Sequence, residues 1–559
     1  MTATAALRKL ASVARTYGAG SSEIKRELLR LLERSRLKTA RELLRLHETL
    51  CFLRAYPDDR ELLDTVERML ASFERRGDLR RRRDALEDTG VAGTRIRYRF
   101  FWPMAHWIVD RWPGQLSLEW DEPETVERIG RAIPQLITTI EAETLARLRG
   151  PVRRNLRRLL AEGETDAAYL VNGIRGMAGN DLTREAFHDA IDASYRVDPG
   201  PGTPSRTHAI YPAAPVVFRK AAPSRSRPDL QAEMRRPPRR VRSVSPREGR
   251  QLIDLACEAM VTRSRDLEAF GYGDPRDVRV VDDGDGLQFV VIGVVPERRR
   301  LLHGLYGYLT LRNGVPIGYV QIDPLMRSAG IHYNTFETFR GGEAAHVFGR
   351  VLATTLHLFG AESLSIEPYQ LGQGNAEGLE SGAWWFYYKL GFRPRDAKVR
   401  RVLRGELARM KRNPRHRSNR ATLEKLAAAH MQFEQSSSAP PLPHPPWEIG
   451  TLVSNTLAAH SGAGRRQASA ACSREAARLL GLRSMRAWTA SERQAWSRWS
   501  PLVLALPGVS RWSIANRRAL VRIVRAKGGR RDGDFVKLFD AHPRLGPAIL
   551  SAAFSVRGE

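Results

Sequence analysis

The stretch Trp384-Trp385-Phe386-Tyr387-Tyr388-Lys389-Leu390-Gly391-Phe392 says most about the fold of this chain. Five consecutive aromatic residues are more than one buried helix face needs for packing. Gly391 is suited to end a helix, because glycine adopts a positive φ at little cost. We therefore predict an aromatic helix that ends at Leu-Gly-Phe and turns several rings toward a pocket.

The residues upstream predict a strand, a glycine turn and a second helix. Ile331 to Phe339 has the pattern of a strand, and it leads directly into Arg340-Gly341-Gly342-Glu343. From Ala344 to Phe359 apolar residues recur at spacings of three and four, which indicates a helix that begins at the glycines. Glycines let backbone N–H groups approach a phosphate, and a helix N-terminus adds partial positive charge. The turn suits a pyrophosphate, although an ordinary strand-to-helix turn has the same composition.

The neighbouring segments predict a mixed α/β domain. A helix over 249–270 precedes strands over 278–281 and 287–292. Strands over 305–311 and 315–322 meet at Asn313-Gly314, a pair that favours the positive φ angles of a tight hairpin. A short strand over 363–366 then separates the glycine-turn helix from the aromatic helix.

This order of elements, with its Ala-x-x-aromatic-Tyr-x-Lys-Leu-Gly-Phe helix, resembles the GNAT superfamily of acyl-CoA N-acyltransferases over about residues 249–402. The resemblance implies an α+β fold with a mixed, mainly antiparallel sheet and helices on both faces. It also implies acetyl-CoA or another acyl-CoA, with the pantetheine arm between two splayed strands. The reaction would be acyl transfer to an amine by direct attack.

The resemblance assigns roles to particular residues. Tyr387 would protonate the departing thiolate, and Ala383 occupies the position of the family's helix alanine. Glu337 and Glu367 are the candidates for the general base by position, and each could instead be structural. Phe339 and Glu380 stand where the family usually has a polar residue and an asparagine. The cofactor-binding candidates are Arg340, Gly341, Gly342, Glu343, Ala344 and Asn375.

At 559 residues the chain is longer than one hydrophobic core usually organises, so we predict several domains. Amphipathic periodicity marks both ends of the chain as mostly helical, whereas two Pro- and Ser-rich stretches lack the apolar residues of a core. The predicted segments are a helical N-terminal domain (1–196), a linker (197–247), the GNAT-like domain with a basic helical extension (248–434), a second linker (435–446) and a helical Trp-rich C-terminal domain (447–559).

The charge suggests an anionic partner. Lys and Arg number 91 against 62 Asp and Glu, so the formal net charge is +29. Basic residues concentrate in 235–242 and 395–420, which could contact nucleic acid. The alternative function is therefore a nucleic-acid-binding protein with a degenerate, non-catalytic GNAT-like domain. Coding bias toward arginine on ordinary solvated surfaces would give a similar composition.

The cysteines, the histidines and the apolar stretches argue against a disulfide-rich, zinc-binding or membrane protein. Three cysteines far apart in sequence form no disulfide framework or zinc motif, and His332, His346 and His357 lack the spacing of metal ligands. No apolar stretch is long enough for a signal peptide or a membrane span, so we expect a cytoplasmic protein without a metal. The residues specify no particular amine acceptor and no oligomeric state.

Overall fold

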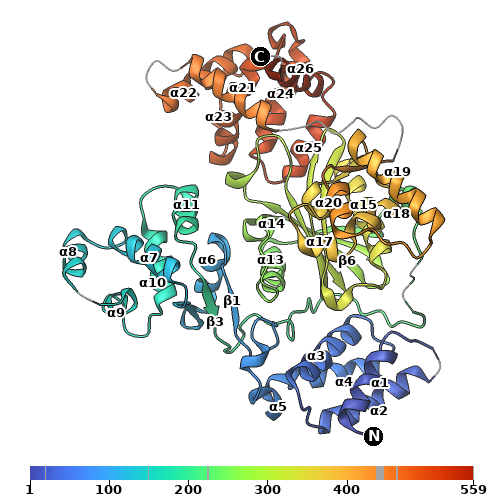
Figure 1. The fold of residues 1–559 in the computed structure, drawn as a ribbon. Coiled ribbons are helices and arrows are strands. Elements are labelled where there is room, and N and C mark those ends of the chain that lie inside the picture. The colour runs from blue at the N-terminus through green and yellow to red at the C-terminus, as the bar shows by residue number, and fades with distance from the viewer. Residues whose placement is uncertain are drawn as a thin grey trace. The chain divides into compact units, whose positions relative to one another are not determined.

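The computed structural model describes residues 1–18, 20–148, 150–222, 224, 226–435, 446–460 and 464–557 (Figure 1). The chain forms two compact units, and each contains segments that are distant in sequence. The first unit comprises residues 1–223, 251–272 and 311–317, and the second comprises 224–250, 273–310 and 318–559. The units are described one at a time.

The first unit is mostly helical, as the periodicity predicts. Its opening helices pack through leucines such as Leu29, Leu46 and Leu50, which are fully buried. Thr39 and Glu42 form a capping box that fixes the start of the third helix. The helices are α1 (Ala3–Val13), α2 (Ser21–Arg34), α3 (Ala40–Ala55), α4 (Arg60–Ala71), α5 (Gly77–Arg80), α6 (Trp102–Arg111), α7 (Pro123–Ala132), α8 (Thr139–Arg147), α9 (Val152–Arg157), α10 (Asp166–Gly176) and α11 (Asp181–Ile191).

This unit also contains a small sheet that the sequence did not predict. The strands β1 (Ile96–Tyr98), β2 (Leu116–Leu118) and β3 (Tyr195–Val197) pair antiparallel in the order β1-β3-β2. Strands of three residues are too short to establish an alternating pattern. The aromatic residues that follow β1 fill the core, because Phe100, Trp102 and Trp107 are all buried.

The second unit is mixed α/β and contains a nine-stranded sheet. Its strand order is β11-β12-β10-β9-β8-β7-β6-β5-β4. Among the pairs whose register is described, only β9 with β10 is parallel. The strands are β4 (Arg240–Ser243), β5 (Gly273–Gly284), β6 (Leu287–Val294), β7 (Tyr306–Arg312), β8 (Val315–Leu325), β9 (Ser328–Thr335), β10 (Ser363–Ile366), β11 (Arg393–Pro394) and β12 (Met431–Glu434).

The remaining helices of the chain lie before, between and after these strands in the sequence, and those within residues 251–272 belong to the first unit. The glycine-turn helix and the aromatic helix form where the sequence predicts them, as α15 and α18. The helices are α12 (Leu230–Arg235), α13 (Pro246–Val261), α14 (Glu268–Gly271), α15 (Ala344–Phe359), α16 (Pro368–Leu371), α17 (Ala376–Glu380), α18 (Ala383–Lys389), α19 (Ala397–Arg412), α20 (Arg420–Leu426), α21 (Pro446–Ala459), α22 (Arg465–Leu480), α23 (Ala490–Ala505), α24 (Ile514–Lys527), α25 (Asp532–Asp540) and α26 (Leu545–Arg557).

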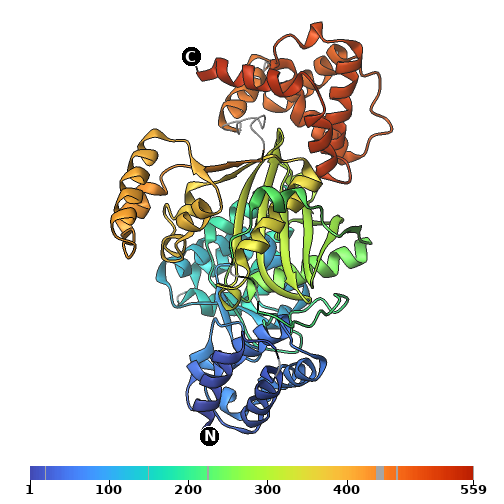
Figure 2. The ribbon, with the colours of Figure 1, turned by 90° about the vertical axis from the view of Figure 1, so that its right-hand side faces the viewer.

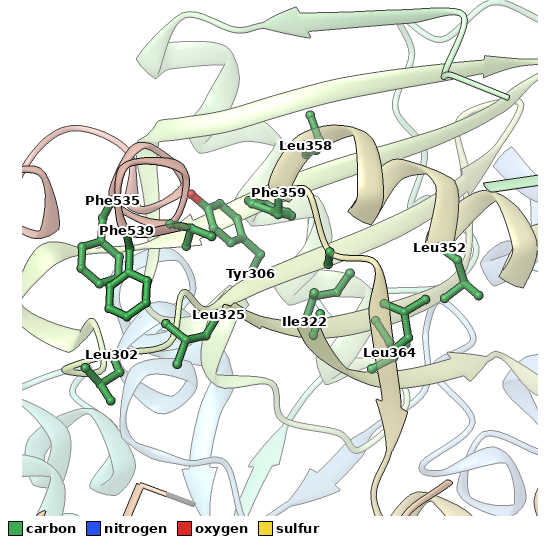
Figure 3. Close-up of a cluster of buried hydrophobic side chains, with 14 of the residues drawn as sticks. Leu302, Tyr306, Ile322, Leu325, Leu352, Leu358, Phe359, Leu364, Phe535 and Phe539 are labelled. Carbon is green, nitrogen blue, oxygen red and sulfur yellow. The ribbon is translucent and has the colours of Figure 1, made fainter. Parts of the chain in front are cut away.

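Helix α25 completes the hydrophobic core beside the sheet. Phe535 and Phe539 are buried and point toward Tyr306 on β7 and Leu325 on β8 (Figure 3). The Tyr306 ring also lies 4.6 Å from that of Phe359, at the end of α15. Side chains from the C-terminal helices therefore belong to the same core as the strands.

A buried polar network holds the same helices in place. The Arg299 guanidinium donates to the carbonyl oxygens of Lys527 (2.9 Å) and Arg530 (3.1 Å). The Lys527 ammonium donates in turn to the His303 carbonyl (2.8 Å) and forms an ion pair with Asp532 (3.1 Å). These bonds satisfy cations that would be costly to bury alone.

The structure describes most of the first predicted linker but little of the second. Residues 197–247 contain α12 and β4, and Leu230 and Met234 of α12 are buried. The segment therefore holds more structure than its composition indicates. The second linker, 435–446, falls mainly on residues 436–445, which lie outside those that the structure describes. None of the helices in the described ranges is long and apolar enough to cross a membrane.

Candidate functional site

The parallel strands β9 and β10 pair only near their beginnings. Ser328, Ala329 and Gly330 of β9 are in register with Ser363, Leu364 and Ser365 of β10. Strand β9 continues to Thr335, whereas β10 ends at Ile366 and the chain enters α16 at Pro368. The second half of β9 therefore extends beyond the part that β10 covers.

The turn before α15 presents a run of unused backbone donors. Gly341 has a φ of 76°, a conformation that glycine adopts without strain. The cap residue Glu343 makes no side-chain hydrogen bond to the helix end, and the first bond into the helix is from Val347 N–H to the Glu343 carbonyl. Among the hydrogen bonds of the described residues, none uses the N–H groups of 341, 342, 344, 345 or 346. These N–H groups at a helix N-terminus suit an anion.

Two predicted cofactor-binding side chains are engaged within the protein. Arg340 donates from Nε to the Thr335 carbonyl (3.0 Å) and forms an ion pair with Glu377. The Asn375 side chain caps α17, because it accepts from Gly378 N–H (3.1 Å) and donates to the Tyr369 carbonyl (3.1 Å). Both residues therefore shape the loop beside the turn.

Tyr387 lies among aromatic rings and keeps its hydroxyl free. Its ring is 5.4 Å from that of Phe348 on α15 and 5.8 Å from that of Phe392. Burial, with a smaller effect of the nearby Tyr333, raises the pKa of Tyr387, so the phenol stays protonated at neutral pH. No hydrogen bond in the described part of the chain involves its hydroxyl.

Tyr333 connects Tyr387 to the start of α15. Its hydroxyl donates to the Ala344 carbonyl (3.1 Å) and accepts from the Thr335 hydroxyl (2.9 Å). Its ring packs 5.1 Å from that of Phe348. The second half of β9, the glycine turn and the aromatic helix are thus brought together.

His332 lies between two carboxylates near the same end of β9. Its Nδ1 is 3.0 Å from Glu367 Oε1, and its Nε2 is 3.5 Å from Asp323 Oδ2. Burial alone would lower the pKa of His332, but the bonds to Asp323 and Glu367 raise it to about 9. The hydrogen bond from His332 lowers the pKa of Glu367, so a carboxylate and an imidazolium face each other at neutral pH.

The two glutamates predicted as general bases have different surroundings. Glu367 belongs to this group, whereas Glu337 lies exposed in a short 3₁₀ turn at Glu337–Phe339. The spacing of His332 in the sequence gave no indication of its partners Asp323 and Glu367. The parallel pairing of β9 with β10 was the signal that could have revealed them, since it aligns His332 with the residue after Ile366.

A cavity of about 510 Å³ lies elsewhere in this unit, at the C-terminal end of α18. Its lining includes Lys389, Arg393 and Phe433, but neither Tyr387 nor the glycine turn. No group of His, Cys, Asp and Glu side chains in the described ranges could hold a metal ion.

Comparison with known proteins gives no match: no family model, no curated protein and no solved structure resembles the chain significantly.

Proposed function

We propose that this protein is an acyl-CoA-dependent N-acyltransferase of the GNAT type that transfers an acyl group, in the simplest case acetyl, to an amine. The observation that carries the proposal is one juxtaposition. Tyr333 and Phe348 link three parts: the N–H groups at the start of α15 that no described hydrogen bond uses, the half of β9 that β10 does not pair, and Tyr387, whose hydroxyl has no described hydrogen bond. The GNAT resemblance implies these three parts in this arrangement.

The residues fit an acyl-CoA in two respects. The N–H groups of 341, 342, 344, 345 and 346 would bind the pyrophosphate without displacing any hydrogen bond described for them. The edge of β9 beyond Gly330, which β10 does not pair, would offer main-chain groups to a pantetheine arm. Acyl-CoA supplies the acyl group as a thioester. Arg340, by contrast, would act through the loop that it holds with Glu377.

The chemistry requires one proton donor and one proton acceptor. The amine nitrogen forms a bond to the acyl carbon as the carbon–sulfur bond breaks. Glu367 accepts the proton that the amine loses, directly or through a water, and Tyr387 donates its phenolic proton to the departing thiolate. His332 orients Glu367 through the 3.0 Å contact. Glu337 remains the second candidate for the base.

Calorimetric titration of the full-length protein with acetyl-CoA tests the proposal. We expect binding within the ~1 μM to 1 mM range typical of enzyme substrates. Gly341→Asp should weaken it by at least about tenfold, because a carboxylate would repel the pyrophosphate at short range. Gly341→Asn is the matched control, since Asn and Asp tolerate a positive φ similarly and a side chain there meets no atom within 4 Å.

The proposal fails if the wild-type protein gives no binding heat with acetyl-CoA, or if the Asp and Asn variants bind it equally well. Thermal unfolding followed by circular dichroism should show the same unfolding temperature for both variants.

The second candidate function is nucleic-acid binding by a protein whose GNAT-like domain does not catalyse. It is favoured by the cationic surface of α19. Absence of acetyl-CoA binding together with tight, salt-dependent binding of nucleic acid would select it.

A further inference from the structure

Helix α19 presents an unusually uniform positive surface. Its exposed cations have no carboxylate partner among the ion pairs and hydrogen bonds of the described residues. They are Lys398, Arg400, Arg401, Arg404, Lys411 and Arg412. Figures 1 and 2 both draw this helix, in orange, at the outer edge of its unit. The cations are therefore accessible.

The opposite side of α19 faces the protein. Val399 and Leu403 are buried, and so is Glu406, which is the helix's one acidic residue. Glu406 accepts hydrogen bonds from Ser418 (2.5 Å) and Arg409 (2.9 Å) and lies 3.0 Å from His416 Nε2. At 100° per residue the exposed cations fall on the side away from this stripe. The outer face of α19 thus carries no negative charge.

Exposed arginines elsewhere in the chain are often neutralised locally. Arg99 forms ion pairs with Glu122 and Asp192, and Arg327 pairs with Glu362. The exposed arginines in those places have carboxylate partners, whereas the exposed cations of α19 have none among the described residues. Helix α22 also carries exposed arginines without a described carboxylate partner, but the exposed Glu475 lies among them, whereas the outer face of α19 has no acidic residue.

We propose that the outer face of α19 binds the phosphate backbone of a nucleic acid without reading its sequence. The helix has 16 residues and is about 24 Å long, so its row of cations can follow several consecutive phosphates. Arg400, Arg404 and Lys411 lie along one line of the helix surface, within about 40° of one another. The proposal is independent of acyl-CoA binding.

An anionic membrane is the less suitable polyanion. Helices that lie in a membrane surface bury an apolar face among the lipids. Val399 and Leu403 of α19 are buried against the protein, Val402 and Leu407 are partly buried there, and no residue of the helix is among the large exposed hydrophobic side chains. Only charge would attract α19 to lipid, whereas phosphate contacts alone suffice for non-specific binding of nucleic acid.

Fluorescence anisotropy with a labelled 20-base-pair DNA and the same sequence as RNA, across a salt series, tests this surface. The full-length protein should bind both with a steep decrease in affinity as salt rises. Removing three contacts should lower the slope of log K against log salt by about 2.7 and weaken binding at least about tenfold. The variant is Arg400→Gln, Arg404→Gln and Lys411→Gln, which keeps good helix formers.

The matched control removes the same charge from α22, where exposed arginines also lack described carboxylate partners. It carries Arg465→Gln, Arg474→Gln and Arg478→Gln. An equal loss in both variants would show that net charge alone drives binding and would overturn the proposal. So would a wild-type protein that binds neither nucleic acid, or one that binds phosphatidylserine vesicles through α19 more tightly than either.

Discussion

Tyr387 is the residue whose surroundings bear most directly on chemistry. Its hydroxyl makes no described hydrogen bond, so Tyr387→Phe should leave folding intact. If the phenol protonates the leaving thiolate, the change should lower kcat by about 10²- to 10⁴-fold with little effect on acetyl-CoA affinity. Thiol release from acetyl-CoA in the presence of a panel of primary amines measures this.

Tyr388→Phe is the control for that change, because it removes the same hydroxyl from the next position of α18. Tyr388 stacks on Trp384 and under Arg393 through its ring, which phenylalanine preserves. Equal losses in the two variants would contradict the assigned role of Tyr387.

The charge on His332 should make the free energy of unfolding depend on pH. The folded-state pKa of about 9 exceeds the value of about 6.5 expected when the chain is unfolded. The folded state therefore holds a proton that the unfolded state loses, so the stabilisation is complete below pH 6.5 and disappears as pH rises to 9. The change over this window is on the order of 3 kcal/mol.

Urea unfolding at several pH values between 6 and 9.5 measures this effect. His332→Gln should flatten the fall in the free energy of unfolding, whereas His357→Gln, at an exposed position of α15, should not. Parallel curves for wild type and His332→Gln would rule out the charged histidine.

A residue could be singled out from the sequence when the residues around it in the chain form a motif, and not when its partners lie on other strands. Tyr387 and the glycines could be proposed from the sequence because a motif within one helix or turn singles them out. The partners of His332 lie on β8 and just after β10, so only strand register brings them together. Arg340 and Asn375 stay predictions as cofactor-binding residues, and their bonds to Glu377 and Tyr369 could not be read from spacing.

At the scale of helices and strands, the clearest prediction concerns α25. Phe535 is fully buried in the core that also contains Tyr306, so Phe535→Ala should cost about 3 to 5 kcal/mol. Hydrogen exchange should then increase in β7 as well as in α25. Leu538→Ala on the same helix is the control, since Leu538 is 40% exposed. Faster exchange confined to α25 would mean that the helix does not stabilise the sheet.

Elements with a strong pattern matched the prediction closely. Strand β10 coincides with the predicted residues 363–366, and the Asn313-Gly314 hairpin has the expected positive φ angles of 47° and 78°. Short elements were missed instead. Three-residue strands and the six-residue α12 carry too few positions for periodicity, and their stability comes from tertiary contacts such as the burial of Met234.

At the scale of the whole molecule, the sequence predicted several domains and the structure has two compact units. A mixed α/β region and helical ends could be read from composition. The grouping of residues 251–272 with the N-terminal helices could not, because contacts between distant segments leave no local pattern. The net charge of +29 likewise gave no indication that α19 would keep its cations unpaired.

The shared core of β7 and α25 has a consequence for how the protein is made. Gly533 N–H donates to the Tyr306 hydroxyl across 227 residues, and Phe535 is buried in the same hydrophobic core as Tyr306. A ribosome that adds about 5 to 20 residues per second needs on the order of ten seconds or more to travel that far. The part of this core that α25 completes must therefore wait for that helix on the nascent chain, so a chaperone that shields β7 during translation should raise the yield of native protein.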